Sequence, residues 1–236
     1  MSAAALALKQ FGYENKAFWR NPAAAFFTFV FPLMFLVLFN GIFGHSQFFV
    51  PAIAAFSVIT ACFTNIAMGV TIARDQGVLK RIRGTPLPAL SYLIGRVLHA
   101  VFIAVILVVI VTIVGIVFYD VDLPDSLGRL ALTLAVGAAT FCSLGLAITA
   151  AIPNEEAAPA IVNAAVLPLS FVSDIFVDSA GAPEWMQTLG DIFPIKHFAQ
   201  AMLASFDPAF REWSETHLVV MAAWGLGALI LALRFF

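Results

Sequence analysis

Long stretches without charged residues divide this chain and predict helices that cross a membrane. A helix needs about 20 consecutive apolar residues to cross the hydrocarbon core of a bilayer. The first stretch, 21–73, is long enough for two crossings, and glycine and polar residues around 41–47 break it in the middle. The later stretches are 97–119, 130–154, 157–173 and 216–233. The pattern therefore predicts six membrane-spanning helices, of which the fifth is the shortest.

The loops between these stretches carry their charges asymmetrically. With both chain ends on one side of the membrane, nine of the 12 basic residues lie on that side and ten of the 14 acidic residues lie on the other. Lysine and arginine accumulate in the cytoplasmic loops of membrane proteins. We therefore expect a multi-pass protein with both termini in the cytoplasm. Because no organelle-targeting segment precedes the first helix, the expected location is a prokaryotic plasma membrane.

The composition of the 236 residues agrees with a membrane protein and excludes other classes. Hydrophobic residues make up 62% and charged residues 11% of the chain, whereas soluble domains carry about 25% charged residues. The net charge of −2 lacks the positive excess of a nucleic-acid-binding protein. Cys62 and Cys142 each stand alone within an apolar stretch, so we expect packing roles and no metal site. The expected fold class is an all-α integral membrane protein.

Residues 1–21 are too polar to cross a membrane but have the pattern of a helix that lies at its surface. With helical periodicity, apolar side chains share one face and basic side chains share another. These are Leu8, Phe11, Phe18 and Trp19 on the first face, and Lys9, Lys16 and Arg20 on the second. We expect an interfacial helix that binds membrane lipid, with its cations near anionic headgroups. A generic membrane anchor is the alternative.

The segment 73–90, between the second and third predicted spans, has the highest density of charge in the chain. Its apolar residues share one helical face, which is formed by Ile72, Val78, Leu79 and Ile82. Gly84 can end a helix, and Pro86 prevents its continuation. A short amphipathic helix of this kind indicates docking to a partner. The alternative is a loop whose cations only fix the topology.

The order of residues in this segment resembles the cytoplasmic loop of type-2 ABC exporter permeases, the membrane subunits of ATP-driven exporters. The resemblance rests on Arg74-Asp75, Gly77, Leu79-Lys80-Arg81, Arg83 and Thr85-Pro86, followed by Gly95 and Arg96 at the start of the third span. Ile82 stands where the family has leucine, and the acidic residue that often precedes the arginine is missing. The six predicted spans and the surface helix extend the resemblance over nearly the whole chain.

The resemblance implies a single transmembrane permease domain, 1–236, built from consecutive segments. They are the interfacial helix (1–21), spans one and two (22–72), a cytoplasmic coupling helix (73–90), spans three to five (91–173), an extracytoplasmic loop with short re-entrant helices (174–213) and span six (214–236). Within that loop, the re-entrant segment is marked by Pro183, Trp185, Pro194 and His197. An aromatic belt at the membrane surface is the other interpretation of this loop.

The resemblance also implies partners for the chain. Two copies of a separate ABC ATPase subunit would bind ATP and Mg, and a second permease subunit, identical or similar, would complete the substrate pathway. The residues expected to contact the ATPase are Arg74, Asp75, Gly77, Val78, Leu79, Lys80, Arg81, Ile82, Arg83, Thr85 and Pro86, joined by Glu155 and Glu156. The expected cargo is a drug, a lipid or another amphipathic molecule.

Uncharged polar residues within the predicted spans are candidates for the substrate pathway. They are Asn40, Ser57, Thr60, Thr64, Asn65, Thr140 and Asn163. Serine and threonine often form contacts between membrane helices, so each of them has a packing role as its alternative. Asparagine is costlier to expose to lipid, which favours Asn65 and Asn163 for the pathway.

The chain lacks the sequence motifs of an enzyme. It has no phosphate-binding Gly-x-x-x-x-Gly-Lys-Ser/Thr, so ATP hydrolysis would reside in another polypeptide. None of the four histidines lies three or four residues from another, which argues against a metalloprotease. We therefore expect an exporter subunit with no cofactor of its own. A self-sufficient channel or secondary carrier, in which the basic loop only fixes topology, is the alternative.

Overall fold

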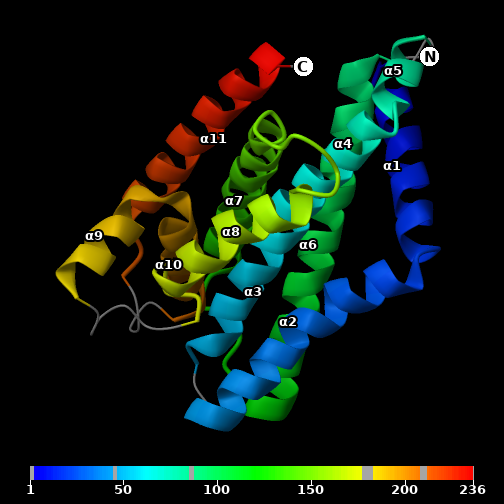
Figure 1. Ribbon diagram of the computed structural model, residues 1–236. Coiled ribbons are helices and arrows are strands. Elements are labelled where there is room, and N and C mark those ends of the chain that lie inside the picture. Colours follow the sequence, from blue (N-terminus) through cyan, green and yellow to red (C-terminus); the bar gives the residue numbers. More distant parts are fainter. Residues whose placement is uncertain (1–2, 45–46, 85–87, 177–182, 208–211, 236) are drawn as a thin grey trace.

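The computed structural model describes residues 3–44, 47–84, 88–176, 183–207 and 212–235, and within these ranges the chain forms helices and no strands. Figure 1 shows a bundle of long helices with shorter helices at one end and along one side. The elements are α1 (Ala3–Trp19), α2 (Pro22–Phe43), α3 (Phe49–Ile59), the π-helix η1 (Thr60–Thr64), α4 (Asn65–Asp75), α5 (Val78–Arg83), α6 (Ala89–Tyr119), α7 (Leu127–Ile148), α8 (Ala158–Phe171), α9 (Glu184–Ile192), α10 (Pro194–Phe206) and α11 (Glu215–Phe235). The all-α fold class is confirmed.

Five helical segments in the described part of the chain are long and apolar enough to cross a membrane. They are Pro22–Phe43, Phe49–Asp75, Ala89–Tyr119, Leu127–Ile148 and Glu215–Arg234. The expected fifth span is α8, which has 14 residues. A helix of that length extends about 21 Å, against about 30 Å for the hydrocarbon core. The predicted count of six full spans is therefore not confirmed, because α8 ends before it can cross.

The second span is a continuous helical segment made of α3, the π-helical turn η1 and α4, and it forms the centre of the bundle. Its first part, α3, is predominantly apolar and is buried at every residue, which is typical of a helix in the interior. In the apolar window of the whole span 72% of the residues are buried, against 17% for α2. The helix α10 contacts α3, α7 and α11 and is buried along almost its whole length. Of the two short helices before the last span, α9 and α10, it is α10 that lies inside the bundle.

The N-terminal helix α1 packs lengthwise against the first half of α6. With 31 residues, α6 is about 46 Å long and exceeds the thickness of the hydrocarbon core, so its first turns can accompany α1 beyond the apolar layer. Phe11 and Phe18 pack on His99, with ring centroids 6.4 and 5.4 Å apart. Leu8 and Trp19 stay exposed. The apolar face that the sequence assigned to lipid is therefore shared between α6 and the surroundings.

The two described chain ends lie at the upper end of the molecule in Figure 1, together with α5 and the connection between α7 and α8. The C-terminal ends of α2 and α6 lie at the lower end. This arrangement agrees with termini that share one side of the membrane with the coupling helix. That this side is the cytoplasm stays a prediction from the charge pattern.

Candidate functional site

The second span ends where the coupling helix was expected to begin. Beyond α4, Gly77 adopts a left-handed backbone conformation (φ 69°), which glycine reaches without steric strain. The six residues of α5 follow directly. The Arg81 Nη2 donates a hydrogen bond back to the Gln76 carbonyl over 2.9 Å. The sequence Gln76-Gly77 therefore turns the chain out of the span and into a short helix at the end of the bundle.

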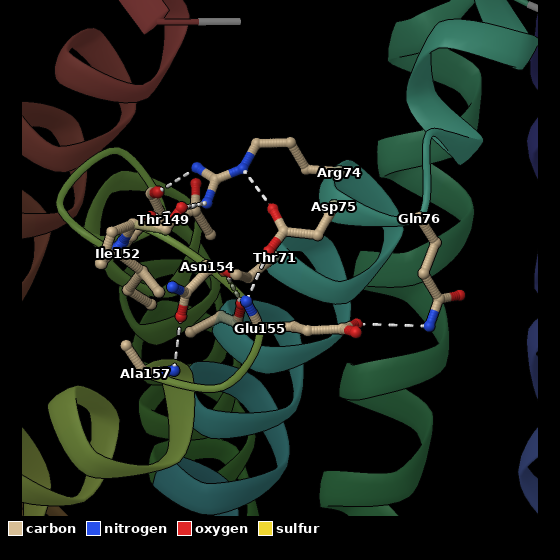
Figure 2. Close-up of polar contacts among 11 residues, drawn as sticks. Thr71, Arg74, Asp75, Gln76, Thr149, Ile152, Asn154, Glu155 and Ala157 are labelled. Carbon is tan, nitrogen blue, oxygen red and sulfur yellow. Dashed lines mark hydrogen bonds and ion pairs between the residues drawn. The ribbon is translucent and has the colours of Figure 1, made fainter.

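Arg74, in the last turn of α4, reaches the connection between α7 and α8 (Figure 2). Its guanidinium donates to the carbonyls of Thr149 (2.8 Å), Ile152 (2.6 Å) and Pro153 (3.4 Å). The last carbonyls of a helix have no partner within that helix, and α7 ends at Ile148. Arginine is suited to satisfying several such carbonyls because it presents charged donors in a planar fork. Arg74 thereby ties the end of α4 to the end of α7.

Asp75 and Gln76 hold the other side of the same connection. The Asp75 Oδ2 accepts a hydrogen bond from the Glu155 backbone N–H, and its Oδ1 lies 3.4 Å from the Arg74 Nε (Figure 2). The Gln76 Nε2 donates to the Glu155 Oε2 over 3.3 Å. Arg74, Asp75 and Gln76 therefore fix the loop 149–157 at its first residue and between residues 152 and 155.

These contacts bring together the two segments that the sequence analysis placed separately on the ATPase side. We name the surface formed by residues 76–82 and 153–156 the coupling surface. Its exposed charged residues are Lys80, Arg81, Glu155 and Glu156, and its half-buried apolar residues are Val78, Leu79 and Ile82. The coupling surface therefore carries both signs of charge around a partly accessible apolar stripe.

The residues that carry the resemblance to the permease loop fall into two groups, one with internal bonds and one exposed at the surface. Arg74 and Asp75 make internal bonds, and their side chains are 37% and 23% exposed. Lys80 and Arg81 are exposed on α5. Three further expected contacts, namely the side chain of Arg83 and the residues Thr85 and Pro86, lie outside what the structure describes.

A second arginine joins α4 to the N-terminal part of the molecule. The Arg96 Nη1 donates to the Gly69 carbonyl (2.7 Å) and to the Tyr92 hydroxyl (2.9 Å), and its Nε lies 3.5 Å from the Glu14 Oε2 on α1. The Arg96 and Glu14 side chains are only 18% and 17% exposed. Gly69 makes this approach possible, because a Cβ atom there would lie 2.5 Å from the Arg96 Nη2. One guanidinium thus connects α1, α4 and α6.

The predicted pathway residues differ in burial. Three of them are buried and donate hydrogen bonds to backbone carbonyls. Asn40 donates to Leu36 and Ser57 donates to Ile53, each within its own helix. Thr140 donates to Met221 on α11. Thr60 and Thr64 are half buried, whereas Asn65 and Asn163 are exposed. Asn40 and Ser57 therefore bond within their own helices, Thr140 joins α7 to α11, and the two asparagines are left at the surface of apolar helices.

Thr60 and Thr64 bound the π-helical turn η1, which interrupts the second span. π-Helical turns are rare in proteins, and those that occur often lie at functional sites. The α7 residue Gly145 packs directly against this turn, since a Cβ atom there would lie 2.7 Å from the Phe63 carbonyl oxygen. The Thr60 hydroxyl lies 3.1 Å from the Phe56 carbonyl. The irregular turn is thus held by a helix contact and by a side chain.

The basic residues of α1 lie as a surface helix requires. Lys9, Lys16 and Arg20 are all exposed. The α1 residues Phe11 and Phe18 are partly covered by α6. The helix thus presents its cations outward and turns Phe11 and Phe18 toward α6, whereas Tyr13 and Trp19 stay exposed.

The segment before the last span places its marked residues in different environments. Pro183 precedes α9, and Trp185 within α9 is 68% exposed. Pro194 begins α10 and is buried. The His197 Nδ1 lies 2.9 Å from the His217 Nδ1 and so links α10 to α11. Within the described ranges no three His, Cys, Asp or Glu residues gather as a metal site.

That Arg74 and Arg96 each connect several helices was not predicted from the sequence. Arg74 was assigned outward to a partner because a motif lists residue types and does not say which way they point. A signal for the Arg96 contact was present, because Glu14 is the only acidic residue in the basic N-terminal segment. No signal in the hydrophobic pattern marked the π-helical turn.

Comparison with known proteins supports the resemblance seen in the sequence. The family model described as ABC-2 type transporter matches residues 11–206. A relative from Escherichia coli K12, named a probable multidrug ABC transporter permease, is 25% identical over 160 residues, which cover 68% of this chain and 44% of the relative. The daunorubicin resistance ABC transporter permease protein of Streptomyces coeruleorubidus is 26% identical over 209 residues, covering 84% of this chain and 72% of the relative. The match thus spans less than half the length of the Escherichia coli relative.

Proposed function

The chain belongs to the ABC-2 type transporter family, and from this premise we propose that it is the membrane-spanning subunit of an ATP-driven exporter. A separate ABC ATPase, in two copies, binds ATP and Mg and hydrolyses the ATP. A second permease subunit, identical or similar, completes the substrate pathway. The chain itself carries out transport and no bond-breaking chemistry.

The coupling surface is the observation that carries this proposal. Its exposed Lys80 and Arg81 and its half-buried apolar stripe suit contact with a soluble partner. Arg74 and Asp75 attach the surface to the ends of α4 and α7 and to the start of α8. In the proposed mechanism, closure of the ATPase dimer pushes α5, and the attached helices follow as a lever that switches the pathway between inward and outward access.

The positions of Asn65 and Asn163 support a pathway at an interface between two permease subunits. Both side chains are exposed on apolar helices of a single protomer. An amide exposed to hydrocarbon without a hydrogen-bond partner costs several kcal/mol, so a second subunit or a wet pathway is expected to cover it. The names of the two relatives refer to multidrug transport and daunorubicin resistance. An amphipathic drug or lipid is the cargo that fits these names and the apolar spans.

The decisive test is purification of the tagged chain from its native membrane, followed by identification of the proteins that accompany it. We expect an ATPase with a Walker motif in an equal molar amount. In liposomes, the chain should move cargo only when this ATPase and ATP are added. An ATPase with its Walker lysine replaced is the control, because it should bind the chain without supporting transport. Cargo movement by the chain alone would overturn the proposal in favour of a channel or secondary carrier.

A further inference from the structure

An apolar cavity of about 330 Å³ lies between α7, α8, the start of α10 and α11, and it also touches the junction of α3 and η1. Its walls include Phe141 and Leu144 of α7, Ala165 and Leu169 of α8, and Trp224 of α11. A second hollow adjoins it along α7 and α11, and the two share Leu144, Ala147, Trp224 and Leu231. The two hollows form one groove, which we name the α8–α11 groove.

The groove exists because α8 is short and packs elsewhere. Its main neighbours are α4 and α10, and α7 is not among them. The small side chain of Ala165 faces the gap. Trp224 and Leu231 at the rim are 37% and 48% exposed, so the groove opens sideways along spans that cross the membrane. Its natural surroundings are therefore lipid.

The chemistry of the lining selects a hydrocarbon occupant. The lining residues are apolar apart from the indole N–H of Trp224, and this group already donates to the Ile192 carbonyl over 2.9 Å. A buried water molecule needs two to four polar partners, so water is not a stable occupant here. Pockets that hold small molecules start at about 300 Å³, and the cavity of about 330 Å³ is large enough for part of an acyl chain.

A cation lies where the groove reaches the end of α11. Leu231 lines the groove, and Arg234 follows three residues later in the last turn. Residues three apart are neighbours on a helix surface, so the exposed guanidinium lies one turn beyond the apolar lining. The chain end at this point lies at the same end of the molecule as α5 (Figure 1). A lipid headgroup with negative charge complements a cation in this position.

We propose that the α8–α11 groove binds an anionic membrane phospholipid, with one acyl chain against Trp224 and the phosphate at Arg234. The bound acyl chain fills the space that α8 leaves beside α7 and so supports this short helix from the side. The site requires only that the chain spans a membrane, and it is independent of the ATPase contact.

Fluorescence quenching by brominated lipids tests this proposal. Replacing Trp19, Trp185 and Trp213 by Phe leaves Trp224 as the only tryptophan. The protein is placed in phosphatidylcholine bilayers that contain increasing fractions of brominated phosphatidylglycerol or brominated phosphatidylcholine. We expect the anionic lipid to compete about fivefold better at Trp224, since one cation near the surface contributes about this factor. Arg234→Gln should bring the ratio close to one.

Two controls separate the groove from the general lipid contact of the protein. A chain with Trp185 as its only tryptophan, which lies beside Glu184, should show no preference for the anionic lipid. In the chain with Trp224 alone, Ala165→Phe should fill the groove and reduce quenching by both lipids. Equal competition by the two lipids at Trp224, or an unchanged preference in Arg234→Gln, would overturn the proposal.

Native mass spectrometry covers the case in which the single-tryptophan chains do not fold. The unaltered chain should retain a phosphatidylglycerol molecule after mild detergent removal, and Arg234→Gln should retain several-fold less. Loss of all phospholipid from the unaltered chain under conditions that keep the protein folded would contradict the proposal.

Discussion

The end of α4 and the helix α5 both carry charged residues within ten residues of each other but use them differently. Arg74 and Asp75 bind the loop 149–157. Lys80 and Arg81 are exposed on α5. A dense charged motif can therefore contain residues that hold the fold together beside residues that stay exposed, and we propose that the exposed ones contact the partner. Substitutions in the two groups should therefore differ in what they impair.

Arg74→Ala should have the largest effect on stability. It removes hydrogen bonds to three carbonyls, two of them part-buried, and leaves the end of α7 without its partner. Hydrogen bonds to a charged group contribute about 1.5–3 kcal/mol, and partial solvent exposure lowers this, so we expect a loss of about 2–3 kcal/mol. Thermal unfolding of the detergent-purified chain, followed by size-exclusion chromatography, measures the loss. Proteolysis within 152–156 should accelerate in the same variant.

Arg74→Lys is the matched control for this prediction. It keeps the charge but cannot bridge several carbonyls with a planar fork. Its stability should lie between those of the wild type and Arg74→Ala. Wild-type stability in both variants would show that the loop is held without Arg74. The charges at the end of α4 would then have no larger structural role than those of α5.

Arg96→Ala should lower stability by about 2 kcal/mol through a different set of contacts. The half-buried Glu14 loses its ion pair, and the Gly69 carbonyl loses a donor. Binding of the ATPase should change little, because neither residue lies on the coupling surface. Glu14→Gln is the milder companion, since it removes the ion pair but leaves the hydrogen bonds of Arg96 to Gly69 and Tyr92 in place. A strong loss of ATPase binding in folded Arg96→Ala would argue that α1 belongs to the coupling surface.

Asp75→Asn should cost about 1 kcal/mol. The remaining amide oxygen can still accept the hydrogen bond from the Glu155 N–H, but the interaction loses its charge assistance. Hydrogen–deuterium exchange should show faster exchange at Glu155 and its neighbours, with protection in α7 unchanged. Equal exchange in the variant and the wild type would show that Asp75 does not hold the loop.

The helical fold and most of the span positions could be predicted because apolar length alone specifies a membrane helix. The exception, α8, has a sequence apolar enough for 17 residues, but the helix itself has 14. Against the predicted stretch 157–173, the helix loses one residue at its start and two at its end, where Val172 leaves the helical conformation (φ −97°, ψ 7°). Such a boundary is absent from the hydrophobic pattern.

The candidate site could be predicted in its location but not in its internal organisation. The charge cluster indicated the short helix α5, and the segment with Glu155 lies beside the end of α4. That these residues contact an ATPase stays a prediction. The direction of Arg74 depends on where the end of α7 lies, which is a contact between residues 75 positions apart. The same holds for Arg96, whose partners Glu14 and Gly69 come from two other helices. Contacts of this range are set by packing and leave no local pattern.

Lys80→Gln with Arg81→Gln should have the smallest effect on stability, within about 0.5 kcal/mol, because exposed charges contribute little to folding. The account places both cations at the ATPase contact, so their effect should appear in binding. Lys16→Gln with Arg20→Gln is the matched control, because it removes the same charge from an exposed position on α1 and from the exposed residue that follows this helix.

The most direct measurement is the Kd of the purified ATPase subunit for the chain in lipid nanodiscs. The account predicts about tenfold weaker binding for Lys80→Gln with Arg81→Gln, which corresponds to about 1.4 kcal/mol, with thermal unfolding unchanged. The Lys16 and Arg20 control should bind within twofold of the wild type. Wild-type affinity in the Lys80 and Arg81 variant, with the chain folded and correctly inserted, would contradict the claim that α5 presents the ATPase contact.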